Sequence, residues 1–279
     1  TKSKKISLKS EVEKEKLSKQ LCDPIGNNPD LNKDEIQFNL TNNQQFLKLF
    51  LSPDTNYNSL LLFHGTGVGK TCTSITIAEQ YSELFKKLNK KIIILLNPSI
   101  KDNFKKNIFN IEKVKKGLQN HQCTGNKYIN EIENFDELTH DKLQQKINKI
   151  IKNKYEFYGY QEFANKIEKL KTKIMSMYTD QNLAFKKFTN KIHELYSNNF
   201  FIIDEAHNIK DSDKLKVLPP LLDLIFRYTI NNKLLLLSAT PMFDNAKEII
   251  WLLNLMLRND NKPILKVNNF FNSNGDFIL

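Results

Sequence analysis

The chain has 279 residues, 40% of them hydrophobic, which is enough to bury one large core or two modest ones. Its formal net charge of +11 comes from 42 basic residues, of which only Arg227 and Arg258 are arginine. A solvated, lysine-rich surface and a nucleic-acid-binding face explain such a charge equally well. No apolar run is long enough to span a bilayer and no signal peptide is visible, so we expect a protein that is neither membrane-spanning nor secreted.

The cysteines favour a reducing compartment. Cys22, Cys72 and Cys123 are odd in number and lie far apart in the sequence. We therefore expect reduced thiols, as in the cytoplasm, and no disulfide framework. His121 and Cys123 together supply too few ligands for a metal site.

Apolar strands alternate with helices along most of the chain. After a basic, partly irregular extension over residues 1–40, residues 44–51 space their apolar side chains like one helix face. Short apolar runs predict buried strands at 59–63, 91–96, 155–160, 200–204 and 233–238. Helices are predicted at 69–88, 161–178, 184–197 and 245–257, and a lysine-rich insertion at about 105–154 contains another amphipathic helix. The pattern predicts an α/β fold, with a mostly parallel sheet and helices on both faces.

One short stretch is typical of a phosphate-binding loop. Residues 64–71 read HGTGVGKT, and they hold three of the eight glycines of the chain between a predicted strand and a predicted helix. Glycines permit torsions and close approaches that a Cβ would block, so the loop amides and the helix N-terminus can face an anion. The pattern GxxxxGK[ST] has a glycine at its first position, where this chain has His64. The ATP-binding residues predicted here are Gly65, Thr66, Gly67, Val68, Gly69, Lys70 and Thr71.

Acidic residues after a later strand complete the predicted ATP site. The sequence FFIIDEAH ends in Asp204, Glu205, Ala206 and His207. Lys70 is expected to reach the β- and γ-phosphates, while the Thr71 hydroxyl and Asp204 hold Mg²⁺. Glu205 is expected to orient and deprotonate the attacking water, and His207 to sense the γ-phosphate.

A third element, LLLLSATPM, follows another predicted strand. Ser238 and Thr240 carry hydroxyl groups on either side of Ala239, at a strand end that we expect beside Asp204. Taken alone, this tripeptide is a weak signal, and a lone DEAH could be a surface turn. The three elements together, in this order, are specific.

GTGVGKT, DEAH and SAT resemble motifs I, II and III of superfamily 2 helicases and translocases. With the segments NPSIKDNF and YEFYGYQEFANKI they resemble a viral subgroup, the helicase-like ATPases of large cytoplasmic DNA viruses of the poxvirus early transcription factor and nucleoside triphosphate phosphohydrolase I type. The resemblance implies a RecA-like P-loop NTPase lobe over residues 41–260. It also implies that residues 261–279 begin a linker to a second RecA-like lobe.

The resemblance also implies roles for single residues. Gln44 occupies the position of a glutamine that reads adenine, although Gln45 is adjacent. His207 and the SAT residues would couple the nucleotide state to motion between lobes. Residues expected to contact a nucleic-acid backbone are Pro98, Ser99 and Lys101, for which an ordinary strand-to-helix turn is the alternative.

For the whole protein the resemblance implies a nucleic-acid-dependent ATPase that uses ATP and Mg²⁺ in viral transcription, at initiation or termination. The implied partners are a DNA or RNA backbone, a second lobe, and subunits of a viral RNA polymerase or transcription factor, without a membrane. The implied locations are the cytoplasmic viral factory and the virion.

Three alternatives stay open. The first is a non-motor, ATP-binding scaffold. The second is a P-loop kinase or AAA+ ATPase, which would be favoured if Ser238 and Thr240 lay far from Asp204. The third concerns Tyr155, Phe157 and Tyr160, which could stack bases but would more often belong to a core. Neither arginine lies in a motif VI context, so we expect weak hydrolysis by this chain alone.

Overall fold

The computed structural model describes residues 40–65, 69–117, 122–211, 216–242, 245–272 and 276–278. The predicted N-terminal extension therefore lies outside the described residues except at Leu40. Thr66, Gly67 and Val68 of the predicted phosphate loop also lie outside them, as do Cys22 and His121.

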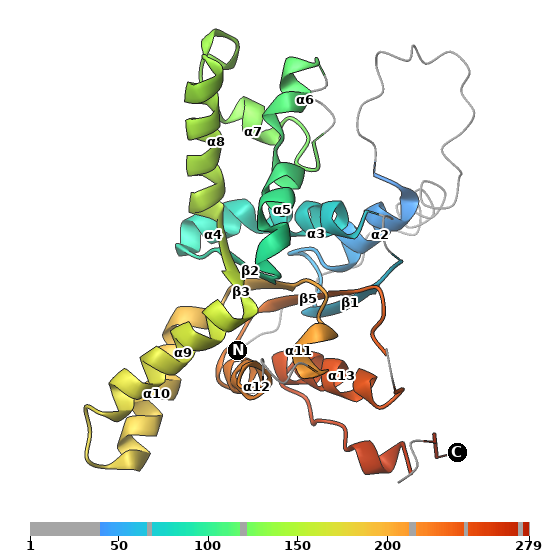
Figure 1. The fold of residues 1–279 in the computed structure, drawn as a ribbon, viewed down its shortest axis with the longest axis vertical. Coiled ribbons are helices and arrows are strands. Elements are labelled where there is room, and N and C mark those ends of the chain that lie inside the picture. Colours follow the sequence, from blue (N-terminus) through green and yellow to red (C-terminus); the bar gives the residue numbers. More distant parts are fainter. Residues whose placement is uncertain are drawn as a thin grey trace, which may run out of the picture.

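A five-stranded parallel sheet forms the centre of the described residues (Figure 1). Its strands are β1 (Ser59–Phe63), β2 (Ile92–Leu96), β3 (Tyr155–Gly159), β4 (Phe200–Ile203) and β5 (Lys233–Ser238), in the spatial order β1-β5-β4-β2-β3. All neighbouring strands are parallel. The predicted α/β fold with a parallel sheet is confirmed.

Both faces of the sheet are buried, as the continuous apolar runs require. In β2, Ile92 and Ile94 belong to the hydrophobic core on one face, whereas Ile93 and Leu95 belong to the core on the other face. The first face is covered by α2 (Asn42–Phe50), α3 (Lys70–Ala78), α4 (Ser82–Leu88) and α5 (Lys101–Ile108), with α6 (Ile111–Lys115), α7 (Lys127–Asn130) and α8 (His140–Lys154). The second face is covered by α9 (Tyr160–Met175), α10 (Gln181–Tyr196), α11 (Asn208–Asp211), α12 (Leu218–Tyr228) and α13 (Glu248–Asn259).

The connection from β2 to β3 forms an arm, residues 101–154, that rises from the sheet as α5 to α8 (Figure 1). The amphipathic helix predicted in the lysine-rich stretch is α8. Its Leu143, Ile147 and Ile151 are buried, while the lysines on its outer side are exposed.

Two helical predictions differ from the structure. The helix predicted at 69–88 is divided by a 3₁₀ turn, Glu79–Tyr81, into α3 and α4. Helix α12 was not predicted, because its second and third residues are Pro219 and Pro220. Proline is tolerated in the first turn, where the backbone N–H groups have no partner within the helix.

The aromatic residues of β3 belong mainly to the core. Tyr155 is 2% exposed and Tyr160, the first residue of α9, is 8% exposed. Phe157 packs against the first core. The structure therefore favours the core interpretation of these residues over base stacking.

The carboxyl ends of all five parallel strands meet at one edge of the sheet. The phosphate loop follows β1, Pro98 follows β2, Asp204 follows β4 and Ala239 follows β5. In open parallel sheets this is the edge at which ligands bind.

Candidate nucleotide-binding site

Gly69 caps helix α3 in the left-handed region, with φ 85° and ψ 20°. This torsion favours glycine, and a Cβ there would also lie 3.0 Å from Gln44 Nε2, so the Gln44 side chain would have to move. Among the described residues, no heavy atom lies within 4 Å of a Cβ placed at Gly65. The backbone freedom of glycine that the sequence suggested is thus needed at Gly69.

Lys70 is held inside the site by its neighbours. Its Nζ donates a hydrogen bond to the His64 carbonyl oxygen at 3.0 Å and lies 3.8 Å from Glu205 Oε1. The His64 backbone N–H in turn donates to the carbonyl oxygen of Ser238 at 3.3 Å. His64 therefore acts through its backbone, which explains how the loop tolerates a side chain at this position.

Asp204 is a buried carboxylate at the end of β4, 7% exposed. Burial, reinforced by the nearby Glu205 carboxylate, raises the pKa of Asp204 from 3.8 to about 6, against the opposing effects of the Glu205 backbone N–H and Lys70. Tyr160, which the sequence did not indicate as part of the site, donates its hydroxyl to the Asp204 carbonyl oxygen. Glu205 has a φ of 44°, a left-handed conformation that is uncommon outside glycine.

Gly69, Lys70, Thr71, Asp204 and Glu205 line one cavity of about 370 Å³. Its walls come from the first turn of α3, from the end of β4 and from α5, where Asn103, Phe104 and Asn107 contribute. Asn103 and Phe104 lie in the segment NPSIKDNF, but nothing in the sequence indicated that they or Asn107 belong to the site, because these residue types are common. A larger cavity, about 630 Å³ between α4 and α8, contains none of the predicted site residues.

The donor set in this cavity fits Mg²⁺. Thr71 and Asp204 offer a hydroxyl and a carboxylate oxygen, which are hard ligands of the kind that Mg²⁺ prefers. Among the described residues no group of three or more His, Cys, Asp or Glu could hold a metal ion. A cation there would take its remaining ligands from phosphate and water, as is usual for Mg²⁺.

His207 joins the second and third motifs. Its Nδ1 lies 2.9 Å from Ser238 Oγ and 3.5 Å from Glu205 Oε2, and its Nε2 lies 3.4 Å from Thr240 Oγ1. Ala239 lies between the two hydroxyl residues and is half-buried. Because β5 lies between β1 and β4, Ser238 touches both His64 and His207. This juxtaposition is the opposite of what the kinase or AAA+ alternative required.

Gln44 lies over the first turns of α3. Its Nε2 donates to Thr73 Oγ1 at 3.1 Å, and its Oε1 accepts from the Thr41 backbone N–H at 3.0 Å in a capping box. The neighbouring Gln45 instead donates to the Leu40 carbonyl oxygen. The structure thus places Gln44, rather than Gln45, beside the phosphate loop.

Pro98 and Ser99 lie in a 3₁₀ turn, Pro98–Ile100, at the end of β2, and Lys101 begins α5. Asn97 Oδ1 accepts from both the backbone and the hydroxyl of Ser99, and Lys101 Nζ lies 3.4 Å from the Phe157 carbonyl oxygen. The same edge of the sheet carries these residues, although local bonds alone account for their conformation.

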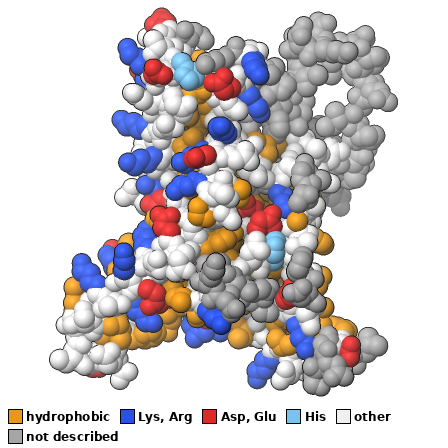
Figure 2. Space-filling model, viewed as in Figure 1, with side chains coloured by type: hydrophobic (Ala, Val, Ile, Leu, Met, Phe, Trp, Pro, Cys, Tyr) orange, Lys and Arg blue, Asp and Glu red, His pale blue; other side chains and the backbone are white. Residues whose placement is uncertain are grey.

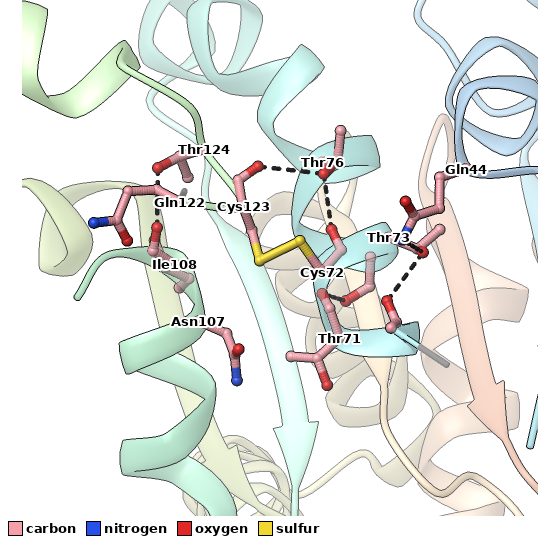
Figure 3. The surroundings of a disulfide bond; sticks show 12 residues. Gln44, Thr71, Cys72, Thr73, Thr76, Asn107, Ile108, Gln122, Cys123 and Thr124 are labelled. Carbon is pink, nitrogen blue, oxygen red and sulfur yellow. Dashed lines mark hydrogen bonds between the residues drawn. A yellow bond between two sulfur atoms is a disulfide. The ribbon is translucent and has the colours of Figure 1, made fainter. Parts of the chain in front are cut away.

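The expectation of reduced thiols is wrong for two cysteines. Cys72 and Cys123 form a disulfide, with their Cα atoms 5.2 Å apart (Figure 3). They are separated by 51 residues in the sequence. The arm folds back so that the chain around Cys123 contacts α3. The spacing of the cysteines in the sequence does not indicate that these two segments meet.

The parallel sheet, with Lys70, Thr71, Asp204 and Glu205 around one cavity at its carboxyl edge, agrees with the helicase-like ATPase domain that the family match shows. Residues 42–274 match the family model described as SNF2-related domain. The chain belongs to the SNF2-related domain family.

Its relatives include proteins of large DNA viruses. The chain is 30% identical over 240 residues to "Putative ATP-dependent RNA helicase L377" of Acanthamoeba polyphaga mimivirus, covering 81% of this chain and 20% of the relative. It is 33% identical over 227 residues to "Putative helicase 087L" of Invertebrate iridescent virus 3, covering 77% of this chain and 20% of the relative. The chain thus spans about a fifth of the length of these curated relatives.

A solved structure, "DEAD-box helicase Mss116 bound to ssRNA and UDP-BeF", aligns over 79% of this chain and 38% of that chain, at 16% identity and a TM-score of 0.43. Among the described residues, no helix is both long and apolar enough to cross a bilayer.

Proposed function

We propose that this chain binds Mg·ATP as the first RecA-like lobe, residues 41–260, of a DExH-type ATPase that nucleic acid stimulates. The observation that supports this most strongly is the convergence of Lys70, Thr71, Asp204 and Glu205 on one cavity. A chain that served only as a scaffold would not need all four side chains.

Lys70 and Glu205 form a pair that ATP would separate. The β- and γ-phosphates offer Lys70 a stronger partner than the Glu205 carboxylate, which lies 3.8 Å away. Glu205 is then free to orient a water molecule and to accept its proton. Mg²⁺ held by Thr71 and Asp204 would neutralise charge on the phosphate oxygens.

The contacts of His207 provide a route from the nucleotide to the rest of the lobe. Glu205 Oε2 and Ser238 Oγ both lie near His207 Nδ1, at 3.5 and 2.9 Å. A change in Glu205 on ATP binding would therefore reach the segment after β5 through His207 and Thr240. Gln44, beside Gly69, is the residue we assign to adenine recognition.

We assign the nucleic-acid backbone contacts to Pro98, Ser99 and Lys101. The next residue in the same turn, Ile100, lines the nucleotide cavity, so a strand bound there would lie beside the ATP site. Figure 2 shows basic side chains spread over the arm and the α9–α10 pair with acidic ones among them, so the net charge alone does not mark a binding face.

Efficient hydrolysis would require a second lobe. The chain has two arginines, and both bind Asp223, Arg227 through Nη2 at 2.7 Å and Arg258 through Nε at 2.8 Å. Neither is free to stabilise the transition state. In the whole protein we place the second lobe after residues 261–279 and infer a role in viral transcription, with polymerase or transcription factor subunits as partners.

The test is a titration of the chain with Mg·ATP, followed by turnover assays with single-stranded RNA and with single-stranded DNA. Lys70→Ala should weaken binding by about 10- to 100-fold, because a hydrogen bond to a charged group contributes about 1.5–3 kcal/mol. Lys146→Ala, at an exposed position on the arm, is the matched control. Unchanged binding by Lys70→Ala would contradict the proposal, and rapid turnover by the verified monomer would contradict the one-lobe account.

A further inference from the structure

The disulfide lies in the wall of the nucleotide cavity. Cys72 follows Thr71 directly and lines the cavity of about 370 Å³ together with Lys70 and Glu205. Its partner Cys123 lines a second cavity, of about 330 Å³, on the arm side of α3. Both cysteines are half-buried, so a small reagent can reach the bond from either side. Lys48, Lys127 and Glu79 line the second cavity, and Lys127 Nζ lies 3.0 Å from Glu79 Oε2.

Besides the sulfur–sulfur bond, the Thr76 hydroxyl links α3 to the chain at Cys123, and further bonds fix the neighbours of Cys123 within the arm (Figure 3). Thr76 Oγ1 donates to the Cys72 carbonyl oxygen at 2.8 Å and lies 3.3 Å from the Cys123 carbonyl oxygen. Thr124 Oγ1 donates to the carbonyl oxygen of Ile108 at 2.9 Å.

The residue before Cys123 is fixed in the same way. Gln122 is 1% exposed and exchanges two hydrogen bonds with the backbone of Asn110, at 2.9 and 3.0 Å. The bonds of Gln122 and Thr124 keep Cys123 in its place in the arm after reduction. Reduction therefore releases the first turn of α3 from the arm, while the Cys123 thiol stays in place for the cross-link to form again.

We propose that Cys72 and Cys123 form a reversible thiol–disulfide modification site that takes a small-molecule disulfide such as oxidised glutathione and regulates Mg·ATP binding. The inference rests on the function proposed above. The disulfide fixes the first turn of α3 to the arm, and this turn carries Lys70 and Thr71. Reduction lets the turn adjust to the phosphates, so the reduced protein binds Mg·ATP more tightly.

The exchange balances in two steps. The Cys123 thiolate attacks one sulfur of oxidised glutathione, forming a mixed disulfide and releasing one glutathione thiolate. The Cys72 thiolate then attacks Cys123 Sγ, forming the protein disulfide and releasing a second glutathione. Both cysteine sulfurs are oxidised, the glutathione disulfide is reduced, and the two thiol protons end on the two released thiols.

The experiment equilibrates the 279-residue chain in reduced or oxidised glutathione, counts its thiols by mass spectrometry and titrates it with Mg·ATP. We expect the reduced chain to bind at least about fivefold more tightly, the lower end of typical coupling between sites. A gain below about fivefold, tighter binding by the oxidised chain, or no disulfide after oxidation would overturn the inference. Absence of Mg·ATP binding in both states would instead contradict the proposed function.

Two single variants sharpen the result. Cys123→Ser should bind like the reduced wild-type chain under both conditions, and Cys22→Ser, which leaves the pair intact, should respond like the wild type. Retained sensitivity in Cys123→Ser would overturn the inference. The wild-type comparison needs no substitution, so it decides the question even where Cys123→Ser fails to fold.

Discussion

The sheet and the arm are built by different means. The strands β2, β4 and β5 bury nearly every side chain, and their apolar contacts define the position of the site. The arm buries one side of its main helix in the core on the first face, and polar groups around Glu79 and the disulfide add to this connection with the sheet. This difference suggests that the sheet edge carries the chemistry while the arm adjusts it.

The polar junction centres on the buried Glu79, which is 7% exposed. Its Oε1 accepts hydrogen bonds from the hydroxyls of Tyr128 and Tyr155, both at 2.5 Å. Its Oε2 lies 3.0 Å from Lys127 Nζ and 3.9 Å from Lys154 Nζ. One carboxylate thus joins the end of α3 to both ends of the arm's second half.

The largest effect should come from the sheet edge. Glu205→Gln should leave Mg·ATP binding within about threefold and reduce nucleic-acid-stimulated turnover by about 10²- to 10⁴-fold, because the amide cannot accept the water proton. The readout is phosphate release with a complete motor or with added second lobe. Glu133→Gln, exposed on the arm, should leave turnover unchanged. Equal losses in the two variants would remove the distinction between edge and arm.

Truncating a buried side chain should lower the free energy of unfolding more in the sheet than in the arm. Ile202→Ala, at a fully buried position in β4, should lower the free energy of unfolding by about 2–5 kcal/mol. Ile147→Ala, in the buried side of α8, should mainly increase hydrogen exchange within the arm. Urea unfolding with hydrogen exchange measures both. Global destabilisation of equal size by Ile147→Ala would mean that the arm and the sheet unfold as one unit.

The raised pKa of Asp204 predicts that the free energy of unfolding depends on pH when Mg²⁺ is absent. The folded state holds this proton up to about pH 6, whereas the unfolded state loses it near 3.8, so stability falls as the pH rises through this window. Above pH 6, Asp204→Asn should be more stable than the wild type by roughly 2–3 kcal/mol. The measurement is the difference in unfolding free energy between the two proteins from pH 4 to 7.5. A difference independent of pH would refute this assignment.

The smallest effect should come from the polar junction. Glu79→Gln keeps an acceptor for the tyrosines but removes the charge that faces Lys127, and it should cost about 1–3 kcal/mol of stability. Glu83→Gln, exposed on α4 of the same face, is the matched control and should cost under about 0.5 kcal/mol. Urea midpoints of the two variants give the comparison, and equal midpoints would show that the junction contributes nothing.

The sequence predicted the sheet well because each strand is a short apolar run that ends in turn residues. It also predicted that Ser238 and Thr240 would lie near the acidic pair, since parallel strands end at one edge. Helix α12 was missed because two prolines lie in its first turn, and proline usually argues against a helix. The pairing of Cys72 with Cys123 depends on the path of the arm, which neither residue spacing nor composition records. The same is true of the bond from Tyr160 to the backbone of Asp204.

The arm is the crossover between two adjacent parallel strands, β2 and β3. Such a crossover needs about a dozen residues to return the chain to the sheet, and this one runs from Asn97 to Lys154. The exposed positions of this long crossover can change without altering the register of the sheet, because only its buried side packs on the core. Evolution can therefore vary this segment among relatives, and an experimenter can attach a fluorophore at exposed Asn148 to follow its movements during the nucleotide cycle.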